Sequence, residues 1–322
     1  MVWRVLLLGA LAGLAGLVLW WRGPNWTGVL HAFAGVGWRW VVFAVGFNLL
    51  SVLVRALCWQ TVIDQSMRRP HPRYGLVLSG YSVGMLANAV LPGRVGEAAR
   101  VSVLVRRLPR RKGLWPTLLG TVAAQRLLDL FPLLALVLCV LVFATVPGWA
   151  FATMLVVVSA GSVLLALGIL LARKHGGRLE RLGRLRGVIL LLRQGLGVLR
   201  RAAVIAGLFE AAGWLCQLLA VWATMRAFQI QLPLIAAALV LVLMNVANLV
   251  PLWPGNVGVL QAAIALPLIG YGIPYTHGFA FGIGLQAIEA SVGITFGTAF
   301  FLHEGLSLTR LRSTPDEAHI QT

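Results

Sequence analysis

Uninterrupted apolar runs recur from one end of this 322-residue chain to the other, and several of them are long enough to cross a bilayer. A helix of about 20 apolar residues spans the hydrocarbon core. Hydrophobic residues make up 59% of the sequence and charged residues only 11%, which is more apolar surface than a water-soluble fold can bury. The runs lack the alternation of membrane β-strands, so helices are the spanning element. We therefore predict an all-α polytopic membrane protein.

The runs predict about six full spans and two interrupted helical pairs. Residues 75–91 and 234–252 each end near a Pro-Gly pair and are followed by further apolar or mixed residues. Basic segments flank residues 75–91 on both sides, and a re-entrant pair keeps both on the cytoplasmic side. A second re-entrant pair over 234–272 then enters from the outside, and eight simple crossings are the alternative. The predicted full spans are residues 4–21, 38–57, 117–146, 149–172, 202–226 and 279–302.

Basic residues are concentrated in three connecting segments and give the chain a net charge of +18. Of the 27 Lys and Arg residues, 18 lie in residues 58–74, 98–116 and 173–201. The positive-inside rule places these segments in the cytoplasm, together with both termini and a polar tail over 303–322. We expect an inner (plasma) membrane protein with an uncleaved first helix. Attraction to anionic lipid headgroups fits the same residues, whereas nucleic-acid binding is not expected without a soluble basic and aromatic module.

Leu and Arg are interleaved in residues 178–186, and an apolar run from Val188 to Leu192 follows. An amphipathic helix on the cytoplasmic face fits this pattern. A plain basic connector fits it as well.

Two similar five-residue strings indicate an internal repeat. Residues 92–96 read PGRVG and residues 254–258 read PGNVG, at an offset of 162 residues. Related residues accompany them: Asn88 and Asn248 precede the breaks, and Gln125 with Asp129 recurs as Gln286 with Glu289. Inverted repeats of this kind are common in transporters, and their interrupted helices point to the substrate site. We predict one transmembrane domain with halves at 1–146 and 147–302.

Charged side chains within the apolar segments mark a candidate site. Glu97, Asp129, Glu210 and Glu289 lie within or beside such segments. Each charge at bilayer depth costs about 2.5 kcal/mol or more, so each should face a polar interior and have a partner. Ion pairs that merely fasten helices together are the alternative to a functional site. The candidate partners are Arg55, Arg94, Arg100 and Arg126, with Arg94, Glu97 and Arg100 on one helical face.

The Pro-Gly breaks suggest what this site binds. A helix that restarts after Gly93 or Gly255 presents unpaired backbone N–H groups and a positive dipole inside the membrane. This arrangement suits a phosphate, and the guanidinium groups of Arg94 and Arg100 can pair with its oxygens. Two helix-ending turns without a ligand are the alternative.

No motif indicates a metal or a cofactor. Cys58, Cys139 and Cys216 lie singly in or beside apolar segments, and the six histidines show no ligand pair one helical turn apart. We expect no cofactor and no metal.

At the residues of this candidate site the chain resembles the transmembrane-region family of lysylphosphatidylglycerol synthase, a group of flippase-like membrane proteins. The matching strings are N-x3-P-G-R-x-G-E-x2-R over 88–100, R-L-L-D over 126–129 and P-x2-P-G-x2-G-V over 251–259. The resemblance implies that a modified lipid is moved across the bilayer through Arg94, Glu97, Arg100, Arg126 and Asp129. Gln261 replaces the Glu that such proteins usually carry. No soluble catalytic domain follows residue 302, so we expect no synthase activity.

Three functions follow as hypotheses. A lipid flippase would bind an anionic or modified phospholipid, or a polyprenyl-linked lipid, in a polar path. A non-catalytic partner would hold such a lipid for a separate transferase. An intramembrane serine hydrolase would use Ser82 in a G-x-S-x-G string with a base such as His277, although no strand precedes Ser82. The predicted lipid-binding residues are Asn88, Arg94, Glu97, Arg100, Arg126, Asp129, Asn248, Gly255 and Glu289.

Overall fold

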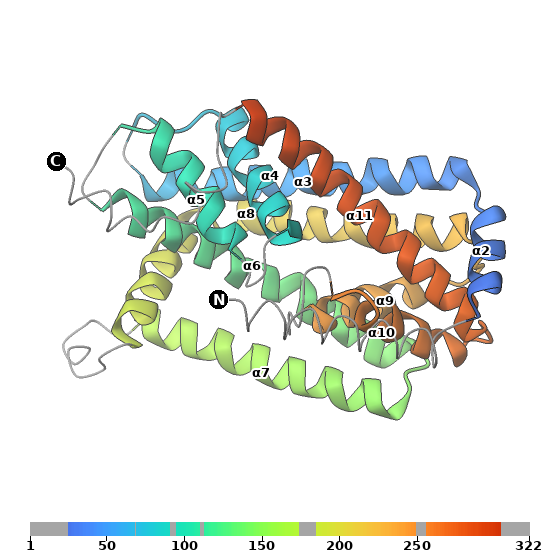
Figure 1. The fold of residues 1–322 in the computed structure, drawn as a ribbon. Helices are drawn as coiled ribbons and strands as arrows, with labels where there is room; N and C mark the ends of the chain where they lie inside the picture. The colour runs from blue at the N-terminus through green and yellow to red at the C-terminus, as the bar shows by residue number, and fades with distance from the viewer. Residues whose placement is uncertain are drawn as a thin grey trace, which may run out of the picture.

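The computed structural model describes residues 25–67, 69–90, 95–109, 113–173, 185–248 and 256–303. Within these residues the regular structure is helical, and no strand occurs (Figure 1). The predicted first span at 4–21 lies outside the described residues. The helices are α2 (Trp26–Ala34), α3 (Trp38–Ser66), α4 (Tyr74–Val90), α5 (Gly96–Arg107), α6 (Leu114–Phe143), α7 (Gly148–Arg173), α8 (Leu185–Ala227), α9 (Leu234–Ala247), α10 (Val259–Ile269) and α11 (Tyr275–His303).

Four described helices are long and apolar enough to cross a membrane. They are α3, α6, the part of α8 from Val204 to Ala227, and α11 up to Leu302. The shortest has 24 residues and is about 36 Å long, against a hydrocarbon core of about 30 Å. These helices confirm the predicted helical, multi-pass fold class.

Two boundaries differ most from the predictions. Helix α3 continues past residue 57 to Ser66, because Pro70 is the first helix breaker in that region. Helix α8 begins at Leu185 instead of at residue 202, because no proline interrupts the Leu- and Arg-rich sequence there. Residues 174–184, which include the start of the predicted amphipathic stretch, lie outside the described residues.

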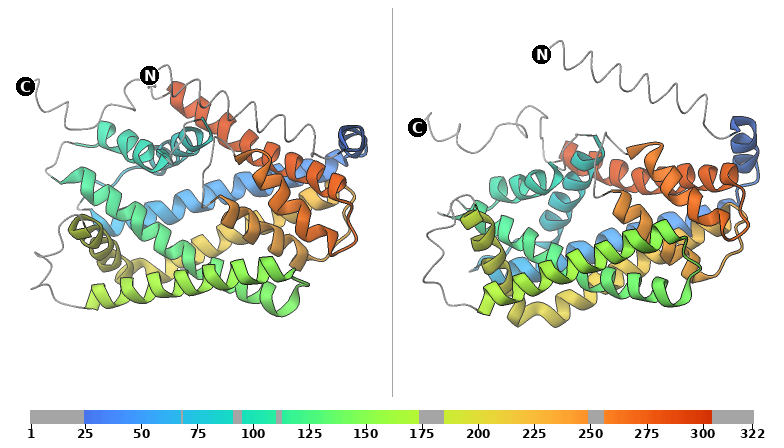
Figure 2. Two further views of the ribbon diagram at one scale, coloured as in Figure 1. Left: turned by 60° about the horizontal axis from the view of Figure 1, so that its bottom comes forward. Right: turned by 90° about the horizontal axis from the view of Figure 1, so that it is seen from below.

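The two predicted interrupted pairs appear as α4 with α5 and α9 with α10. Helices α5, α9 and α10 have 12, 14 and 11 residues, too few to cross a bilayer alone. Helix α4 has 17 residues and packs against α5 through glycines: a Cβ at Gly84 would lie 2.8 Å from the backbone oxygen of Gly96. In Figure 2 these short helices lie among the long ones. Each pair therefore consists of two helices, separated by a break, that pack against other helices of the protein.

Helices α3 and α8 form the antiparallel centre of the bundle (Figure 1). The N–H of Gly37 donates to the oxygen of Ala227 at 2.8 Å, and Ser51 Oγ donates to the oxygen of Gly213 at 3.0 Å. The short helices pack in a similar way on either side of this centre. Helix α4 packs against α5, α3 and α11. Helix α9 packs against α10, α8 and α6. The helices of the first and second halves are thus interleaved.

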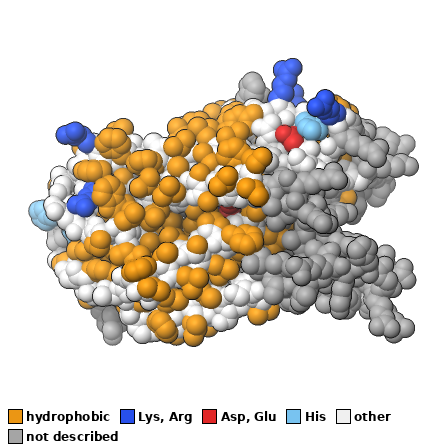
Figure 3. Space-filling model, turned by 180° about the vertical axis from the view of Figure 1, so that it is seen from behind, with side chains coloured by type: hydrophobic (Ala, Val, Ile, Leu, Met, Phe, Trp, Pro, Cys, Tyr) orange, Lys and Arg blue, Asp and Glu red, His pale blue; other side chains and the backbone are white. Residues whose placement is uncertain are grey.

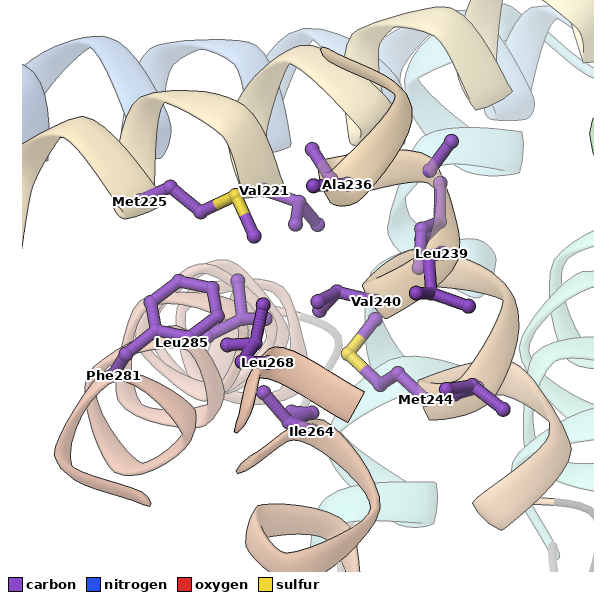
Figure 4. Close-up of a cluster of buried hydrophobic side chains, with 14 of the residues drawn as sticks. Val221, Met225, Ala236, Leu239, Val240, Met244, Ile264, Leu268, Phe281 and Leu285 are labelled. Carbon is purple, nitrogen blue, oxygen red and sulfur yellow. The ribbon is translucent and has the colours of Figure 1, made fainter. Parts of the chain in front are cut away.

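Helix α9 lies in an apolar core formed with α8, α10 and α11. Residues 236–244 of α9 are buried without interruption. A helix that is apolar and buried on every side belongs to a protein interior. In Figure 4, Val240 and Met244 of α9 point toward Ile264 and Leu268 of α10 and toward Leu285 of α11.

Large apolar side chains also cover the exterior. Val142 on α6 and Val204 on α8 are 71% and 76% exposed. In Figure 3, hydrophobic side chains cover much of the visible face, and Lys, Arg and His side chains gather toward its two ends. A surface of this kind fits lipid around the middle of the molecule and water or headgroups at its ends.

Candidate functional site

Arg55 on α3 is the centre of a buried polar network. Its Nη1 lies 3.4 Å from Asp129 Oδ1 on α6 and 3.3 Å from Glu210 Oε1 on α8. Its Nη2 donates to Gln217 Oε1 at 3.0 Å. Gly213 on α8 provides the space, since a Cβ there would lie 2.7 Å from Arg55 Cγ. The guanidinium group therefore joins two carboxylates and an amide at the centre of the bundle.

The two carboxylates beside Arg55 are bound by further donors. Asp129 Oδ1 accepts from Trp214 Nε1 at 3.0 Å, and its Oδ2 accepts from Arg126 Nη1 at 3.2 Å. The Glu210 side chain is fully buried. Because an ionised carboxylate at bilayer depth needs a partner, Arg55 is placed where it can offer its charge to both carboxylates.

Arg126 joins α5 to α6 at the more accessible edge of the network. Its Nε lies 2.8 Å from Glu97 Oε1, while its Nη1 binds Asp129. The Arg126 and Glu97 side chains are 53% and 40% exposed, whereas Asp129 is 14% exposed. The network thus extends from a fully buried carboxylate to a partly exposed ion pair.

Arg100 on α5 is a buried cation, only 5% exposed, with no carboxylate in ion-pair distance among the described residues. Its Nη1 donates to Gln125 Oε1 at 3.0 Å. Its guanidinium carbon lies 4.7 Å from the ring centre of Trp59 and 5.8 Å from that of Tyr81. Trp59 is fixed by a 2.9 Å bond from its Nε1 to Thr121 Oγ1. Within the described part of the chain, Nε and Nη2 of Arg100 have no hydrogen-bond partner.

These two nitrogens of Arg100 have a specific chemical meaning. Nε and Nη2 form one edge of the guanidinium plane, and their N–H groups point in parallel. This edge can bind two oxygens of a single phosphate or carboxylate. The aromatic rings beside the group leave its charge unneutralised. The arrangement is therefore suited to bind an oxyanion.

Gln125 connects Arg100 to the cluster around Arg55. While its Oε1 accepts from Arg100, its Nε2 donates to the backbone oxygen of Arg55 and to Glu210 Oε2, both at 3.2 Å. A continuous path of polar contacts therefore runs from α5 through α6 to α3 and α8.

Amide side chains connect α8 to α11 and, in a separate contact, α10 to α11. Gln217 Nε2 donates to Glu289 Oε1 at 3.4 Å, and Gln261 Nε2 donates to Gln286 Oε1. Gln261 Oε1 also accepts from the N–H of Gly258, before the start of α10. Among the residues that the structure describes, Glu289 forms no ion pair. The carboxyl group of Glu289 is therefore bonded to an amide, whereas that of Asp129 is bonded to two arginines.

Asparagine side chains span both helix breaks. Asn88 Oδ1 on α4 accepts from the N–H of Gly96, the first residue of α5, at 2.8 Å. In the second pair, Asn256 Nδ2 donates to the oxygen of Ala247, the last residue of α9, at 3.1 Å. Asn248 directly follows α9 as its C-cap residue. In both pairs a side-chain amide therefore forms a hydrogen bond across the break between the two helices.

Sequence reasoning identified part of this network. The structure brings Glu97, Arg126 and Asp129 into contact, and Glu289 joins the network through Gln217. Glu210 was recognised as an acid in an apolar run and Arg55 as one of four candidate partners, but the sequence did not specify that these two residues meet. The predicted residues Arg94 and Gly255 lie outside the described residues. The network residues missed as candidates are Trp59, Tyr81, Gln125, Trp214 and Gln217.

The serine-hydrolase hypothesis finds no support in the geometry. His277 Nε2 lies 2.7 Å from the backbone oxygen of Phe228. The backbone oxygen of Ser82 lies beside Gly297, where a Cβ would approach it to 2.8 Å. Gly297 is 20 residues after His277 on α11, a separation of about 30 Å. Ser82 and His277 therefore do not form a catalytic pair here.

Metal ligands are not grouped in the described structure. Among those residues, no three His, Cys, Asp or Glu side chains are close enough to hold a metal ion. Cys58, Cys139 and Cys216 are free thiols.

Comparisons with known proteins match most of the chain. The sequence model described as "Lysylphosphatidylglycerol synthase TM region" matches residues 2–297. A UPF0104 membrane protein of Pyrococcus horikoshii is 25% identical over 128 residues, which are 40% of this chain and 37% of that relative. The aligned part thus covers little more than a third of the relative's length. No solved structure matches the chain.

Proposed function

Since this chain belongs to the family of the lysylphosphatidylglycerol synthase TM region, a family of multi-pass membrane proteins linked to lipid handling, we propose that it is flippase-like. In this proposal Arg100 binds the phosphate of an anionic or modified phospholipid, or of a polyprenyl-linked lipid. The headgroup crosses through the polar network while the acyl chains stay in the bilayer. The matched region is a membrane domain without catalytic machinery of its own, which favours transport or binding over synthesis.

The unpaired edge of Arg100 is the observation that carries the proposal. A buried, charged donor without a partner costs at least about 1–3 kcal/mol. Nε and Nη2 together match two oxygens of one phosphate, and each charge-assisted bond contributes about 1.5–3 kcal/mol. A network that only fastened helices would be more stable with a hydrogen-bond partner for this edge. The Glu97–Arg126 pair, which is partly exposed, lies at the edge where a headgroup would enter.

Residues 1–146 and 147–302 are, in this proposal, the halves of an inverted repeat. The contacting residues Arg55 and Gln217 are 162 residues apart, as are Ser51 and Gly213. This is also the offset between the two Pro-Gly strings. A residue touches its own counterpart only at a two-fold axis. The α3–α8 pair would therefore contain that axis.

The polar contacts support the same correspondence. Arg100 bonds to Gln125 and Gln261 bonds to Gln286, and both pairs are separated by 25 residues. Inverted repeats allow two alternating arrangements of their halves around one fixed site. Alternation about the α3–α8 axis would open the network to one leaflet and then to the other.

The basic connecting segments support a plasma-membrane orientation with cytoplasmic termini. Arg106 and Arg107 end α5, and Arg69 and Arg73 precede α4. Under the positive-inside rule this end of the bundle faces the cytoplasm.

A transport assay with a matched control tests the proposal. Wild-type protein, Arg100→Gln and Arg226→Gln are reconstituted into liposomes with labelled phospholipids, and the lipids that copurify are identified by mass spectrometry. Arg226 is a fair control because it also lies over a tryptophan ring, at 5.0 Å from Trp222, and also has an unpaired Nε among the described residues. It takes no part in the network.

We expect Arg100→Gln to lower transport and copurified anionic lipid at least about 10-fold, because it removes two charged hydrogen bonds. Arg226→Gln should stay close to wild type. Wild-type transport no faster than in empty vesicles across a broad lipid panel would refute the flippase proposal. Equal copurified lipid in wild type and Arg100→Gln would refute the assigned headgroup site.

A further inference from the structure

The second half of the network retains a carboxyl group but has no arginines. Arg55 corresponds to Gln217 at the offset of 162, and Arg100 corresponds to Gln261 at an offset of 161. Asp129, by contrast, corresponds to another acid, Glu289, at an offset of 160. The counterpart of an ion-paired aspartate is therefore a glutamate that is bonded to a neutral amide.

Glu289 lies at the depth where an ionised group is most costly. It is the central residue of the 29-residue α11, 14 residues or about 21 Å from either end. Its described partner is the Gln217 amide, at 3.4 Å. Asp129 receives bonds from Arg55, Arg126 and Trp214 at 3.0–3.4 Å. Without a cation, a carboxyl group at this depth is stable when it carries a proton.

Among the described side chains on the helices around α11, Arg55 is the charged group that acts on Glu289. Helix α11 packs against α2, α3, α4, α8 and α10. Arg55 acts on Glu289 electrostatically, and Gln217 bonds to both. The ionisable side chains described on these helices are His31, Arg39, Arg55, Cys58, Asp64, Tyr74, Tyr81, Glu210, Cys216 and Arg226, with Tyr275 and His277 on α11 itself.

We propose that Glu289 is a proton-binding site, and that its proton is coupled to the binding of an anionic headgroup at Arg100. The coupling, though not the proton site, rests on the function proposed above. A path of polar contacts joins the two residues through Gln217, Arg55 and Gln125. An anion at Arg100 disfavours a second negative charge at Glu289, so binding of the anion favours binding of the proton. By linkage the effect is reciprocal, and low pH strengthens anion binding.

Infrared spectroscopy of the purified protein, without added lipid, tests the proton site. A protonated carboxyl group has a carbonyl stretch that a carboxylate lacks. The spectrum of wild type minus Glu289→Gln should contain this band at neutral pH, and that of wild type minus Asp129→Asn should not. Gln217→Arg places a cation beside Glu289, so this variant should lose the band as well. Absence of the band from the Glu289→Gln difference spectrum would overturn the proton site.

Binding of short-chain phosphatidylglycerol to the protein in detergent tests the coupling. Wild-type affinity should rise as the pH falls from mildly alkaline to mildly acidic. Glu289→Gln should bind with the same affinity across this range, because its amide mimics the protonated acid. A pH dependence that is unchanged in Glu289→Gln would overturn the coupling. Absence of binding at every pH would refute the headgroup site at Arg100, whereas the infrared result would still decide the proton site.

Discussion

Replacement of Arg55 by glutamine should be among the most destabilising single changes in the network. The Arg55 and Glu210 side chains are 13% and 0% exposed and lie 3.3 Å apart. Removal of one partner from a buried ion pair costs about 3–5 kcal/mol, because the remaining group must either keep an uncompensated charge or take up a proton. Asp129 keeps its bonds from Arg126 and Trp214. The cost should therefore arise chiefly at Glu210, whose remaining partners include the Gln125 amide and the Cys58 thiol but no cation among the described residues.

A double-mutant cycle separates this explanation from general damage to the fold. Glu210→Gln alone leaves Arg55 paired with Asp129 and should cost only about 1–3 kcal/mol. In the Arg55→Gln background the same change removes the unpaired charge, so the double variant should be more stable than Arg55→Gln by at least about 1 kcal/mol. Arg39→Gln, an exposed position on α3, is the control and should stay within about 0.5 kcal/mol of wild type.

Reversible unfolding in mixed detergent micelles, followed by tryptophan fluorescence, gives the four free energies of unfolding. If Glu210→Gln lowers stability further in the Arg55→Gln background, then Glu210 is not an uncompensated charge in that variant. That result would refute the electrostatic reasoning for the centre of the network.

Two further predictions concern packing and the serine motif. Gly96→Ala should destabilise the protein by about 1–3 kcal/mol, because its Cβ would overlap the backbone oxygen of Gly84. Gly75→Ala, with nothing within 4 Å of its Cβ, should change thermal stability by less than about 1 kcal/mol; equal melting temperatures would contradict the close helix contact. Ser82→Ala should leave lipid transport unchanged, and a serine-reactive probe that labels wild type but not this variant would revive the hydrolase hypothesis.

The helices could be predicted from the sequence because hydropathy and helix breakers are local properties. The runs near α3, α6, α8 and α11 are long and apolar, and the Pro-Gly strings marked the gaps after α4 and α9. The boundaries were less accurate, because helices continue beyond the bilayer until a breaker occurs. The extension of α3 to Ser66 and the early start of α8 at Leu185 are examples.

The site could be predicted only in part, because its partners lie far apart in the chain. Arg126 and Asp129 are three residues apart on one helix, so their contact could be predicted from the sequence. The contact of Arg55 with Glu210 depends on how α3 packs against α8, and no local pattern specifies that register. Gln125 and Gln217 are neutral amides. The candidate residues were identified as charged groups in apolar segments, and this criterion does not find a neutral side chain.

A purely structural ion-pair network would be expected to give every charged group an oppositely charged partner, and this one does so only for its central residues. Arg55, Asp129 and Glu210 form a compact group, and Arg126 pairs with Glu97. Among the described residues, the two groups at the ends of the path, Arg100 and Glu289, have no oppositely charged partner within 4 Å. Arg100 is a cation whose Nε and Nη2 edge can bind an oxyanion. Glu289 is an acid that is bonded to the amide of Gln217. Because unpaired buried groups reduce stability, a function in binding gives a better reason for both than a role in fastening helices.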